Sequence, residues 1–313
     1  MSDRRVTVMG SFVADLAFRT PRLPGWGETV MGSAFLLGPG GKGSNQAVAI
    51  ARLEGQVILI TKLGRDTFGE LARRTYLEEG IDPEFIFDTG EHSTGGAAVI
   101  VDQVRGENAI VVVPGAGFHL TPQEVDRAAT AIKESAIFMT QLELPIAIVQ
   151  HGLKLARELR VPTILNPAPA QHLPEEIYPL CDYLTPNEAE AEELAGLHVS
   201  TVSDAGRAAD VLLERGAGNV VVTLGAQGAL VKNANLTQHV AAFDAGPVLE
   251  TTGAGDAFNG GFALALAEGM NIVEATRFGC AVAGISVTGL GTARAMPRRA
   301  EVDALLQRCR GDV

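Results

Sequence analysis

The chain has 313 residues, of which 46% are hydrophobic and 20% are charged, and its formal net charge is −12. This length and composition allow one large α/β domain with a small appendage. The sequence contains no stretch rich in Lys and Arg, which argues against nucleic acid as a partner. Glycine or charge breaks every apolar stretch before it is long enough to span a membrane, so we expect no membrane partner either.

The three cysteines, Cys181, Cys280 and Cys309, are far apart and form no C-x-x-C pair. This arrangement is typical of reduced thiols in a cytosolic protein rather than of a disulfide framework or a zinc site. The N-terminus runs into an apolar strand pattern without the hydrophobic region of a signal peptide. We therefore expect a cytoplasmic protein.

The first part of the chain combines buried strands and helices with a stretch rich in glycine and proline. The patterns predict a strand at 6–12, a loop with edge strands at 20–40, a helix at 45–53, a strand at 57–63 and a helix at 67–79. Two further apolar strands, 97–101 and 109–113, are predicted to form a hairpin across residues 102–108. Together with residues 20–37, this hairpin predicts a small sheet beside the main domain.

From residue 122 onward, helices and strands alternate regularly, which is typical of a parallel sheet covered by helices on both faces. Helices are predicted at 122–134, 145–159, 187–194 and 205–215, strands at 136–140, 162–165, 182–185 and 219–224, and a final helical pair at 257–268 and 271–287. Such sheets bind ligands at the carboxyl ends of their strands. The candidate polar residues at those ends are Asp15, Glu143, Asn166, Asn187 and Gly225.

The sequence Gly253-Ala254-Gly255-Asp256 directly precedes the helical run 257–268. Its glycines allow a tight turn, and its amides would point unpaired out of a helix N-terminus, which is a ready anion site. A carboxylate at this point either caps the helix or acts as a base beside a phosphate. The local sequence favours a cap, and the two interpretations stay open until the other motifs are considered.

A second glycine-rich stretch, Gly38 to Asn45, opens the helix predicted at 45–53. It is not a P-loop, because Gly43 stands where that motif needs Ser or Thr directly after Lys42. Glycine amides, an ammonium group and a carboxamide fit the vicinal hydroxyls of a small polyol. A flexible glycine loop without a ligand is the alternative.

Two further motifs have both a structural and a functional interpretation. Asn187 precedes a predicted helix and Glu190 follows three residues later, which is the pattern of a capping box. The functional alternative is that both residues organise Mg²⁺ and its waters around nucleotide phosphates. Thr223, Gly225 and Gly228 lie in a predicted strand–turn–strand, which is either a tight turn only or a turn that faces a nucleotide.

In their combination and order, these motifs resemble the ribokinase family of carbohydrate kinases. Further stretches that match are 27–29, 43–47, 93–95, 141–143 and 166–170, and the resemblance covers residues 6–308. It implies a Rossmann-like α/β fold, with a mostly parallel sheet, helices on both faces and a small β-sheet lid. The chain would be a single domain, 1–313, with lid insertions at about 15–38 and 93–117, and the lid would form the contact of a homodimer.

The implied reaction is transfer of the ATP γ-phosphoryl group to the primary 5-hydroxyl of a pentose, with D-ribose as the favoured acceptor. Asp256 would be the catalytic base. The amides of Gly253, Ala254, Gly255 and Asp256 would form an anion hole for the charge that develops in transfer. The resemblance assigns the sugar to Asp15, Gly41, Lys42, Asn45 and Glu143.

The same resemblance implies ATP, Mg²⁺ and K⁺ as cofactors. Asn187 and Glu190 match the Mg²⁺ and phosphate motif, and the nucleotide positions are Thr223, Gly225, Gly228 and Cys280. A K⁺ site built largely from backbone carbonyls would comprise Glu250, Thr252, Ser286, Gly289 and Gly291. The family commonly has Asp in place of Glu250 and Ser in place of Ala295. Backbone ligands survive such changes, so we expect activation by K⁺.

The informative departure from the family pattern is Val13, where ribokinases typically have Asn and deoxyribokinase-like members have an apolar residue. A site that loses a polar partner tolerates or prefers a substrate without the corresponding group. 2-Deoxyribose or another pentose is therefore the alternative acceptor, unless Val13 only packs and ribose binds through the polar residues. A nucleoside kinase and a non-catalytic sugar-binding regulator are less favoured, because aromatic residues are few and Asp256 is intact.

Overall fold

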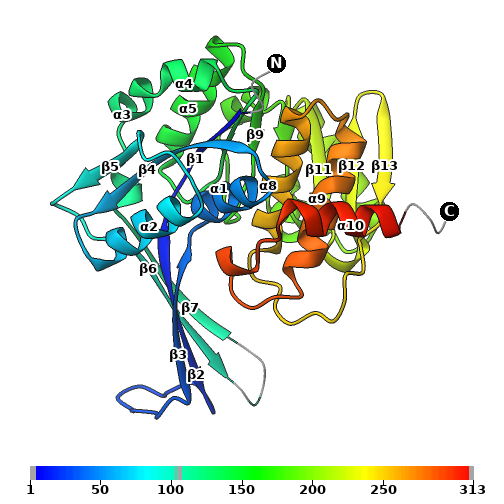
Figure 1. Ribbon diagram of the computed structural model, residues 1–313. Helices are drawn as coiled ribbons and strands as arrows, with labels where there is room; N and C mark the ends of the chain where they lie inside the picture. Colours follow the sequence, from blue (N-terminus) through cyan, green and yellow to red (C-terminus); the bar gives the residue numbers. More distant parts are fainter. Residues whose placement is uncertain (1–4, 103, 105–107, 310–313) are drawn as a thin grey trace.

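The computed structural model describes residues 5–102, 104 and 108–309, and these form two β-sheets of unequal size (Figure 1). In this part of the chain, the large sheet has nine strands in the order β13-β12-β11-β10-β9-β8-β1-β4-β5. Neighbours from β11 to β5 pair in parallel, whereas β12 and β13 form an antiparallel edge. The strands are β1 (Arg5–Met9), β4 (Gln56–Gly64), β5 (Ile86–Thr89), β8 (Ile137–Thr140), β9 (Thr163–Leu165), β10 (Tyr183–Leu184), β11 (Asn219–Thr223), β12 (Ala229–Asn233) and β13 (Leu236–Val240).

Successive residues of the central strands pack into two separate cores, one on each face of the large sheet. Val8 of β1 and Leu59 of β4 belong to one core, whereas Met9 and Ile60, the next residues, belong to the other. Because successive side chains of a strand point to opposite faces, a sheet covered on both faces needs apolar residues at nearly every position. This requirement explains the continuous apolar runs from which the sequence predicts the strands.

Helices cover both faces of the large sheet (Figure 1). One core receives buried residues from α1 (Lys42–Arg52), α2 (Thr67–Glu78), α8 (Ala254–Ala267), α9 (Ile272–Ser286) and α10 (Arg299–Arg308). The other core receives them from α3 (Pro122–Arg127), α4 (Ala129–Lys133), α5 (Ile146–Glu158), α6 (Glu188–Ala195) and α7 (Val202–Glu214). The predicted α/β fold, with a mostly parallel sheet between two layers of helices, is confirmed.

The small sheet projects from the large domain and, in the described residues, has the strand order β3-β2-β6-β7 (Figure 1). Its strands are β2 (Val13–Thr20), β3 (Ala34–Gly40), β6 (Thr94–Asp102) and β7 (Asn108–Gly115). β2 pairs in parallel with β6 and antiparallel with β3, and β7 pairs antiparallel with β6. The two strands of the predicted hairpin are therefore confirmed, while residues 103 and 105–107 of its connection lie outside the described residues.

Some boundaries differ from the prediction. The first strand ends at Met9 rather than at residue 12, because the chain crosses into the small sheet at Val13. Asp15 therefore lies inside β2 and not at the end of a strand of the large sheet. The helices expected from 45 and 257 begin at Lys42 and Ala254, and the helix expected at 122–134 is divided into α3 and α4.

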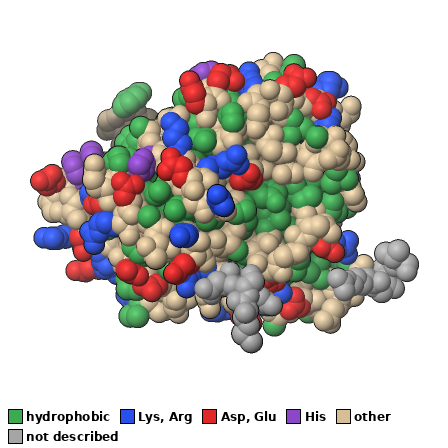
Figure 2. Space-filling view, turned by 90° about the horizontal axis from the view of Figure 1, so that it is seen from above, with side chains coloured by type: hydrophobic (Ala, Val, Ile, Leu, Met, Phe, Trp, Pro, Cys, Tyr) green, Lys and Arg blue, Asp and Glu red, His purple; other side chains and the backbone are tan. Residues whose placement is uncertain are grey.

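The surface of the molecule combines mixed charges with an exposed apolar row on the small sheet. On the face of the molecule in Figure 2, basic side chains lie among acidic ones rather than in a patch of one sign. In the small sheet, Ile110, Val111, Val112 and Val113 of the edge strand β7 are each 51–67% exposed. Soluble monomers rarely leave such a contiguous apolar row uncovered. Within the described ranges, no helix combines the length and the apolar character that a membrane crossing needs.

Candidate active site

The carboxyl ends of adjacent strands and the start of α1 meet at one edge of the large sheet. β8, β9 and β10 are consecutive neighbours in the sheet, and Glu143, Asn166 and Asn187 follow them in the chain. Lys42 N–H, at the start of α1, donates to Glu143 Oε2 at 2.8 Å, and Gln46 Nε2 donates to Asn166 Oδ1 at 3.2 Å. The side chains after these strands and the first turns of α1 thus share one site.

Asp256 lies in the first turn of α8 and faces α1. Its Oδ2 accepts a hydrogen bond from Asn45 Nδ2 at 2.8 Å, and its Oδ1 accepts one from Gln46 Nε2 at 3.2 Å. Gly253, with a φ of 84°, occupies the N-cap position of α8, where no side chain forms a capping bond. The interpretation of Asp256 as a helix cap is therefore wrong, and its carboxylate is directed toward the groups of α1.

A contact between small residues brings α1 and α8 close enough for these bonds. A Cβ at Gly260 would lie 2.7 Å from Ala49 Cβ and 3.0 Å from the Gln46 carbonyl oxygen, so only glycine fits there without movement. Gly260 is one turn after Asp256 on α8, and Ala49 is one turn after Asn45 on α1. The contact therefore sets the helix spacing directly below the hydrogen bonds.

Charged groups around Asp256 shift one another's pKa values. Burial raises the pKa of the Asp256 carboxyl, while the Lys42 ammonium and the Asn45 hydrogen bond lower it and the Glu143 carboxylate raises it; the net shift is upward. For Lys42, burial lowers the pKa, but the carboxylates of Asp256, Glu143 and Glu190 together outweigh burial and raise it. The site thus pairs a permanently charged ammonium group with a carboxylate that binds a proton more readily than an exposed one.

Two amides in the first turn of α8 have no hydrogen-bond acceptor among the described residues. In the described part of the chain, the N–H groups of Gly255 and Asp256 have no acceptor, whereas Ala254 N–H donates to Thr251 O at 3.2 Å. A Cβ at Gly255 would meet nothing within 4 Å. Unpaired amides at an open helix N-terminus attract anions. The turn therefore has the geometry that an anion hole requires, and that role stays a prediction.

Glu143 lies across the start of α1. Its Oε2 accepts hydrogen bonds from Lys42 N–H and from the Ser11 hydroxyl, and a carboxylate in this position complements the helix dipole. Gly41 forms the turn into the helix, with a φ of 86°. A Cβ at this position would lie only 2.6 Å from Val13 N, which is too close. No other residue fits this turn, because it combines a left-handed backbone with a close approach to β2.

Val13 and Asp15 are two residues apart on β2 and therefore share one face of the strand. Ala14 and Leu16 occupy the opposite face and pack into the core around α1 and α8. Val13 is 3% exposed, yet it belongs to neither apolar core. Its side chain is thus on the same side of β2 as the Asp15 carboxylate.

Asp15 is held by the segment after α9. Thr292 Oγ1 lies 3.1 Å from Asp15 Oδ2 and 3.0 Å from Pro39 O. Burial raises the pKa of Asp15 to about 6; the Thr292 hydrogen bond lowers it, and the carboxylates of Glu143 and Asp256 raise it further. Three carboxyl groups from three separate segments therefore face the same space, where hydroxyl donors would relieve their mutual repulsion.

Two buried acceptors in this region lack donors. Among the described residues, neither Asn45 Oδ1 nor Gln141 Oε1 has a hydrogen-bond partner. An orphaned buried polar atom costs about 1–3 kcal/mol. A polyol bound beside Asn45 would supply a hydroxyl donor, which accords with the prediction of a sugar at this helix start.

The capping box at α6 is confirmed. Glu190 N–H donates to Asn187 Oδ1 at 2.8 Å, and the Glu190 carboxylate accepts from Asn187 N–H at 2.9 Å and from its Nδ2 at 3.0 Å. Burial raises the pKa of Glu190, the Asn187 bond and Lys42 lower it, and Asp256 raises it. Within the described ranges, no three His, Cys, Asp or Glu side chains are grouped to bind a metal directly. The Mg²⁺ role of this motif stays a prediction.

The predicted strand–turn–strand is also confirmed. Thr223 ends β11, the 3-10 turn Gly225–Gln227 follows, and β12 returns antiparallel. Gly225 and Gly228 have φ values of 51° and 92°, and a Cβ at Gly228 would collide with the Val240 carbonyl oxygen. The backbone therefore requires glycine at residue 228 whether or not a nucleotide binds there.

The predicted cation positions fall on two segments, one before α8 and one at and after the end of α9; they are Glu250, Thr252, Ser286, Gly289 and Gly291. Glu250 joins the segments, because its Oε2 accepts from Gly291 N–H at 2.9 Å and its N–H donates to Val287 O at 3.3 Å.

Cys280 lies in α9 and is 6% exposed, and burial raises the pKa of its thiol to about 12. That thiol is an uncharged packing group.

Residues 3–299 match the pfkB family of carbohydrate kinases. The chain belongs to that family. The family prediction is therefore confirmed, and the protein is a carbohydrate kinase.

Relatives of this carbohydrate kinase include enzymes named for two different sugars. The ribokinase of Haemophilus influenzae is 39% identical, over 97% of this chain and 99% of its own. The deoxyribokinase of Salmonella typhi is 36% identical, over 93% and 95%. Among solved structures, the Arabidopsis thaliana ribokinase complexed with ribose and ATP is similar with a TM-score of 0.92 and 30% identity, over 98% of this chain and 99% of that chain.

Three residues of this carbohydrate kinase site have contacts that the sequence motifs do not assign. Gln46 contacts Asp256, Asn166 contacts Gln46, and Thr292 contacts Asp15. Gln46 directly follows Asn45, and Asn166 directly follows β9 at the ligand edge, so the position of both residues in the sequence pointed to the site. Thr292 carried none, because it is 277 residues from its partner and lies in an irregular segment.

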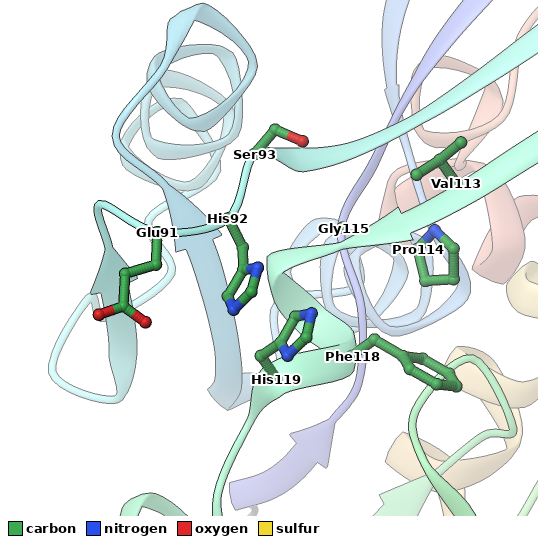
Figure 3. A pocket seen from close by; sticks show the side chains of 8 residues that line it. All are labelled: Glu91, His92, Ser93, Val113, Pro114, Gly115, Phe118 and His119. Carbon is green, nitrogen blue, oxygen red and sulfur yellow. The ribbon is translucent and has the colours of Figure 1, made fainter.

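A hollow of about 440 Å³ lies where the small sheet joins the large domain (Figure 3). Its lining includes His92, Pro114, Phe118 and His119, and none of the predicted site residues. The imidazoles of His92 and His119 stack with centroids 3.4 Å apart and planes 2° from parallel. The lone pair of an imidazole nitrogen lies in the plane of its ring. The lone pairs of two parallel stacked rings therefore do not converge on one shared metal ion. Because none of the predicted site residues lines the hollow, we assign it no part in the candidate active site.

Proposed function

We propose that this carbohydrate kinase transfers the γ-phosphoryl group of ATP to the primary 5-hydroxyl of a pentose, with D-ribose as the first candidate. The observation that carries the proposal is the meeting of α1 and α8, where Asp256 contacts Asn45 beside the open amides of Gly255 and Asp256. A base, a polyol-binding helix start and an anion site thus lie together. The names of the Haemophilus and Arabidopsis relatives support ribose and ATP for this chain as well.

In this proposal each group of the site has one task. Asp15, Lys42, Asn45 and Glu143 hold the sugar hydroxyls. The Asp256 carboxylate takes the proton of the 5-hydroxyl while that oxygen forms its bond to the γ-phosphorus. The bond from phosphorus to the bridging oxygen breaks, and ADP leaves with the electron pair. The α8 amides stabilise the charge on the transferred group, because such transfers depend mainly on positioning and electrostatics.

Mg²⁺ and K⁺ fit the residues present in different ways. Both Glu190 oxygens already accept bonds from Asn187, so these residues would hold Mg²⁺ mainly through its waters, as Mg²⁺ commonly allows. The ion would supply positive charge beside the phosphates. K⁺ would lie between the segments joined by Glu250 and Gly291, where backbone carbonyls offer hard oxygen ligands. The nucleotide would face Thr223 and Gly225.

We also propose that the small sheet serves as a lid over the sugar, because β2 carries both Val13 and Asp15. The exposed row on β7 would be covered by the lid of a second copy in a homodimer. The three cysteines are free, which supports a cytoplasmic location. The partners in this proposal are the sugar, the nucleotide and the second copy.

A specific observation favours 2-deoxyribose as the second candidate acceptor. Val13 lies on the same face of β2 as Asp15, two residues away, and we propose that it contacts the sugar beside that carboxylate. A valine there offers no hydrogen bond to a hydroxyl, and a missing polar contact reduces discrimination against a deoxy substrate. The deoxyribokinase among the relatives supports this candidate too.

The test is ATP consumption by the purified protein with ribose, 2-deoxyribose, other pentoses, fructose and nucleosides, each with and without K⁺. The proposal expects turnover with a pentose and a product phosphorylated at the 5-position, identified by NMR. Absence of turnover with every sugar would overturn the proposal. A preference for ribose over 2-deoxyribose by orders of magnitude would remove the argument from Val13, and a preference for nucleosides would replace the pentose.

A further inference from the structure

We infer that Gln46 is a positioning residue, which orients the Asp256 carboxylate for removal of the sugar proton. The inference deepens the proposed function and rests on the role of Asp256 as the base. Gln46 is fully buried in α1, and its Nε2 donates to Asp256 Oδ1 at 3.2 Å. Asn45, the preceding residue, donates to the other oxygen, Oδ2, at 2.8 Å.

Two donors on two oxygens fix more than one donor can. A single hydrogen bond from Asn45 leaves the carboxylate plane free to turn about the bond that joins it to the side chain. The second bond from Gln46 fixes that plane, and it therefore fixes the direction of the remaining lone pairs of Asp256. A proton acceptor must be aligned with the hydroxyl it deprotonates, because small misplacements cost large factors in rate.

The orientation of the Gln46 amide is itself determined from the other side. Asn166 Nδ2 donates to Thr185 O at 3.0 Å, so Asn166 Oδ1 is the atom that faces Gln46 and accepts from its Nε2 at 3.2 Å. Gln46 Oε1 accepts a hydrogen bond from Gln141 Nε2. An amide with its oxygen turned toward Asp256 and Asn166 would face two acceptors and lose all three bonds.

This amide network is buried and reaches the backbone of the large sheet. Gln46 and Gln141 are fully buried, and Asn166 is 5% exposed. Asn166 bonds the chain directly after β10, and the network therefore links the base to a fixed point of the sheet. Gln141 Oε1 has no partner among the described residues, but all three hydrogen bonds of the Gln46 amide are made, and together they give that amide one defined orientation.

Four titratable groups also face Asp256: Lys42 of α1, Glu143 after β8, Asp15 of β2 and Glu190 of α6. Three of them are acids and oppose ionisation of Asp256, and only Lys42 favours it. The N–H donors of Asn45 and Gln46 stabilise the ionised carboxylate. Removing the Gln46 donor therefore raises the pKa of the base and moves the acid limb of the kcat profile to higher pH.

The test replaces Gln46 by Met, which keeps its length and removes the donor. We expect kcat with the preferred sugar to fall about 10–100-fold, the acid limb of the kcat profile to move up by about 0.5–1 pH unit, and the sugar KM to change less than about threefold. Gln46→Glu adds a negative charge at the same place, so its acid limb should move further than that of Gln46→Met.

The control is Ser135→Ala, which removes a buried hydrogen bond of 2.8 Å to Thr7 far from the site. It should lower thermal stability while leaving kcat and its pH profile unchanged. Should Gln46→Met fail to fold, Gln141→Met removes the bond behind Gln46 without touching Asp256, and the same changes are expected at smaller size.

The outcomes separate the inference from the proposed function. No phosphorylation by the wild-type enzyme would refute the kinase assignment to a pentose. An active wild type, with a Gln46→Met variant whose kcat and acid limb are unchanged, would refute the positioning role alone. A variant in which only the sugar KM rises would likewise refute it, because Gln46 would then act on binding rather than on the base.

Discussion

The junction of α1 and α8 and the small sheet lie on two sides of the proposed sugar site, and they are built differently. At the junction, Asn45, Gln46 and Asp256 are 3%, 0% and 5% exposed, and each makes side-chain hydrogen bonds inside the protein. On the small sheet, the edge strand β7 leaves a row of apolar side chains more than half exposed. The hydrogen bonds of the junction are made within one chain, whereas the small sheet leaves an apolar row exposed, which we propose that a second copy covers.

This contrast assigns separate tasks to the two regions. A base needs fixed geometry, and the glycine–alanine contact between the helices together with the amide network supplies it. As the proposed lid, the small sheet would move against the hydrogen bonds that tie it to the large domain. Among them are the bond from Thr94 N–H to Asp66 Oδ2 and the bond between Thr292 and Asp15. We expect changes at the junction to act on kcat and changes on the small sheet to act on sugar binding or assembly.

The largest effect is expected from Asp256→Asn, because it removes the proton acceptor and keeps its shape. General base catalysis contributes about 10²–10⁴-fold, so kcat should fall by that factor. Sugar affinity measured by calorimetry should persist. Asp303→Asn changes a half-exposed acid of α10 that pairs with Arg299; it is the control and should leave kcat unchanged. A kcat within a few-fold of wild type would refute the role of Asp256 as the base.

The next effect is expected from Gly260→Ala, which separates α1 from α8. The added Cβ would lie 2.7 Å from Ala49 Cβ, so we expect a loss of about 1–3 kcal/mol in the free energy of unfolding and about 10–100-fold in kcat. Gly206→Ala in α7 is the matched control, since its nearest neighbour is 3.6 Å away. That variant should be more stable than wild type by about 0.5–1 kcal/mol and fully active. Equal behaviour of both variants would contradict the spacing argument.

A smaller, pH-dependent effect is expected at Asp15. Its carboxyl loses its proton at a pKa of about 6, so the sugar KM should rise as pH falls through 6 and its acceptor is lost. Asp15→Asn should remove this dependence and weaken sugar binding.

The raised pKa of Asp15 also predicts how the stability of the folded protein depends on pH. Well below pH 4, Asp15 is protonated in both the folded and the unfolded chain. Folding then buries a neutral carboxyl group, which does not cost the desolvation of a charge. As the pH rises to 6 only the unfolded chain loses its proton readily, so the folded state loses stability relative to Asp15→Asn. The variant should be more stable at pH 7 by up to about 3 kcal/mol in urea unfolding. A destabilised variant would contradict the burial argument.

The smallest effect on catalysis is expected from Val111→Lys on β7. A charge in the exposed apolar row should weaken self-association at least about tenfold, measured by analytical ultracentrifugation, with kcat unchanged. Leu77→Lys, on an exposed residue of α2 outside the small sheet, is the control and should not alter assembly. An assembly state unaffected by Val111→Lys would contradict the proposed lid dimer.

The sequence predicts the parts of the site that are built from neighbouring residues. The turns before α1 and α8 follow from their glycines, and the capping box of α6 follows from Asn187 and Glu190. The alternation of strands and helices predicts the fold class, because a sheet covered on both faces is apolar at nearly every position. Each of these signals lies within a few residues.

The remaining features depend on residues far apart in the chain. The side-chain partners of Asp256 lie more than 200 residues away in the chain, so the local sequence favours a helix cap. β13 was missed because its sequence is polar and three of its five residues are exposed at the sheet edge. The end of β1 was placed too late, because the apolar run continues through Phe12, where the chain leaves one sheet for another.

The hydrogen bond between Asn45 and Asp256 joins residues 211 positions apart. A ribosome that adds about 5–20 residues per second needs roughly 10–40 s to travel from one to the other. Throughout that interval the side-chain amides of Asn45 and Gln46 have no Asp256 carboxylate to which they can donate. The apolar small sheet has already been synthesised by then. If Asp256 is the base, as we propose, the enzyme becomes active only after α8 has been synthesised, and we expect a product truncated before α8 to be inactive.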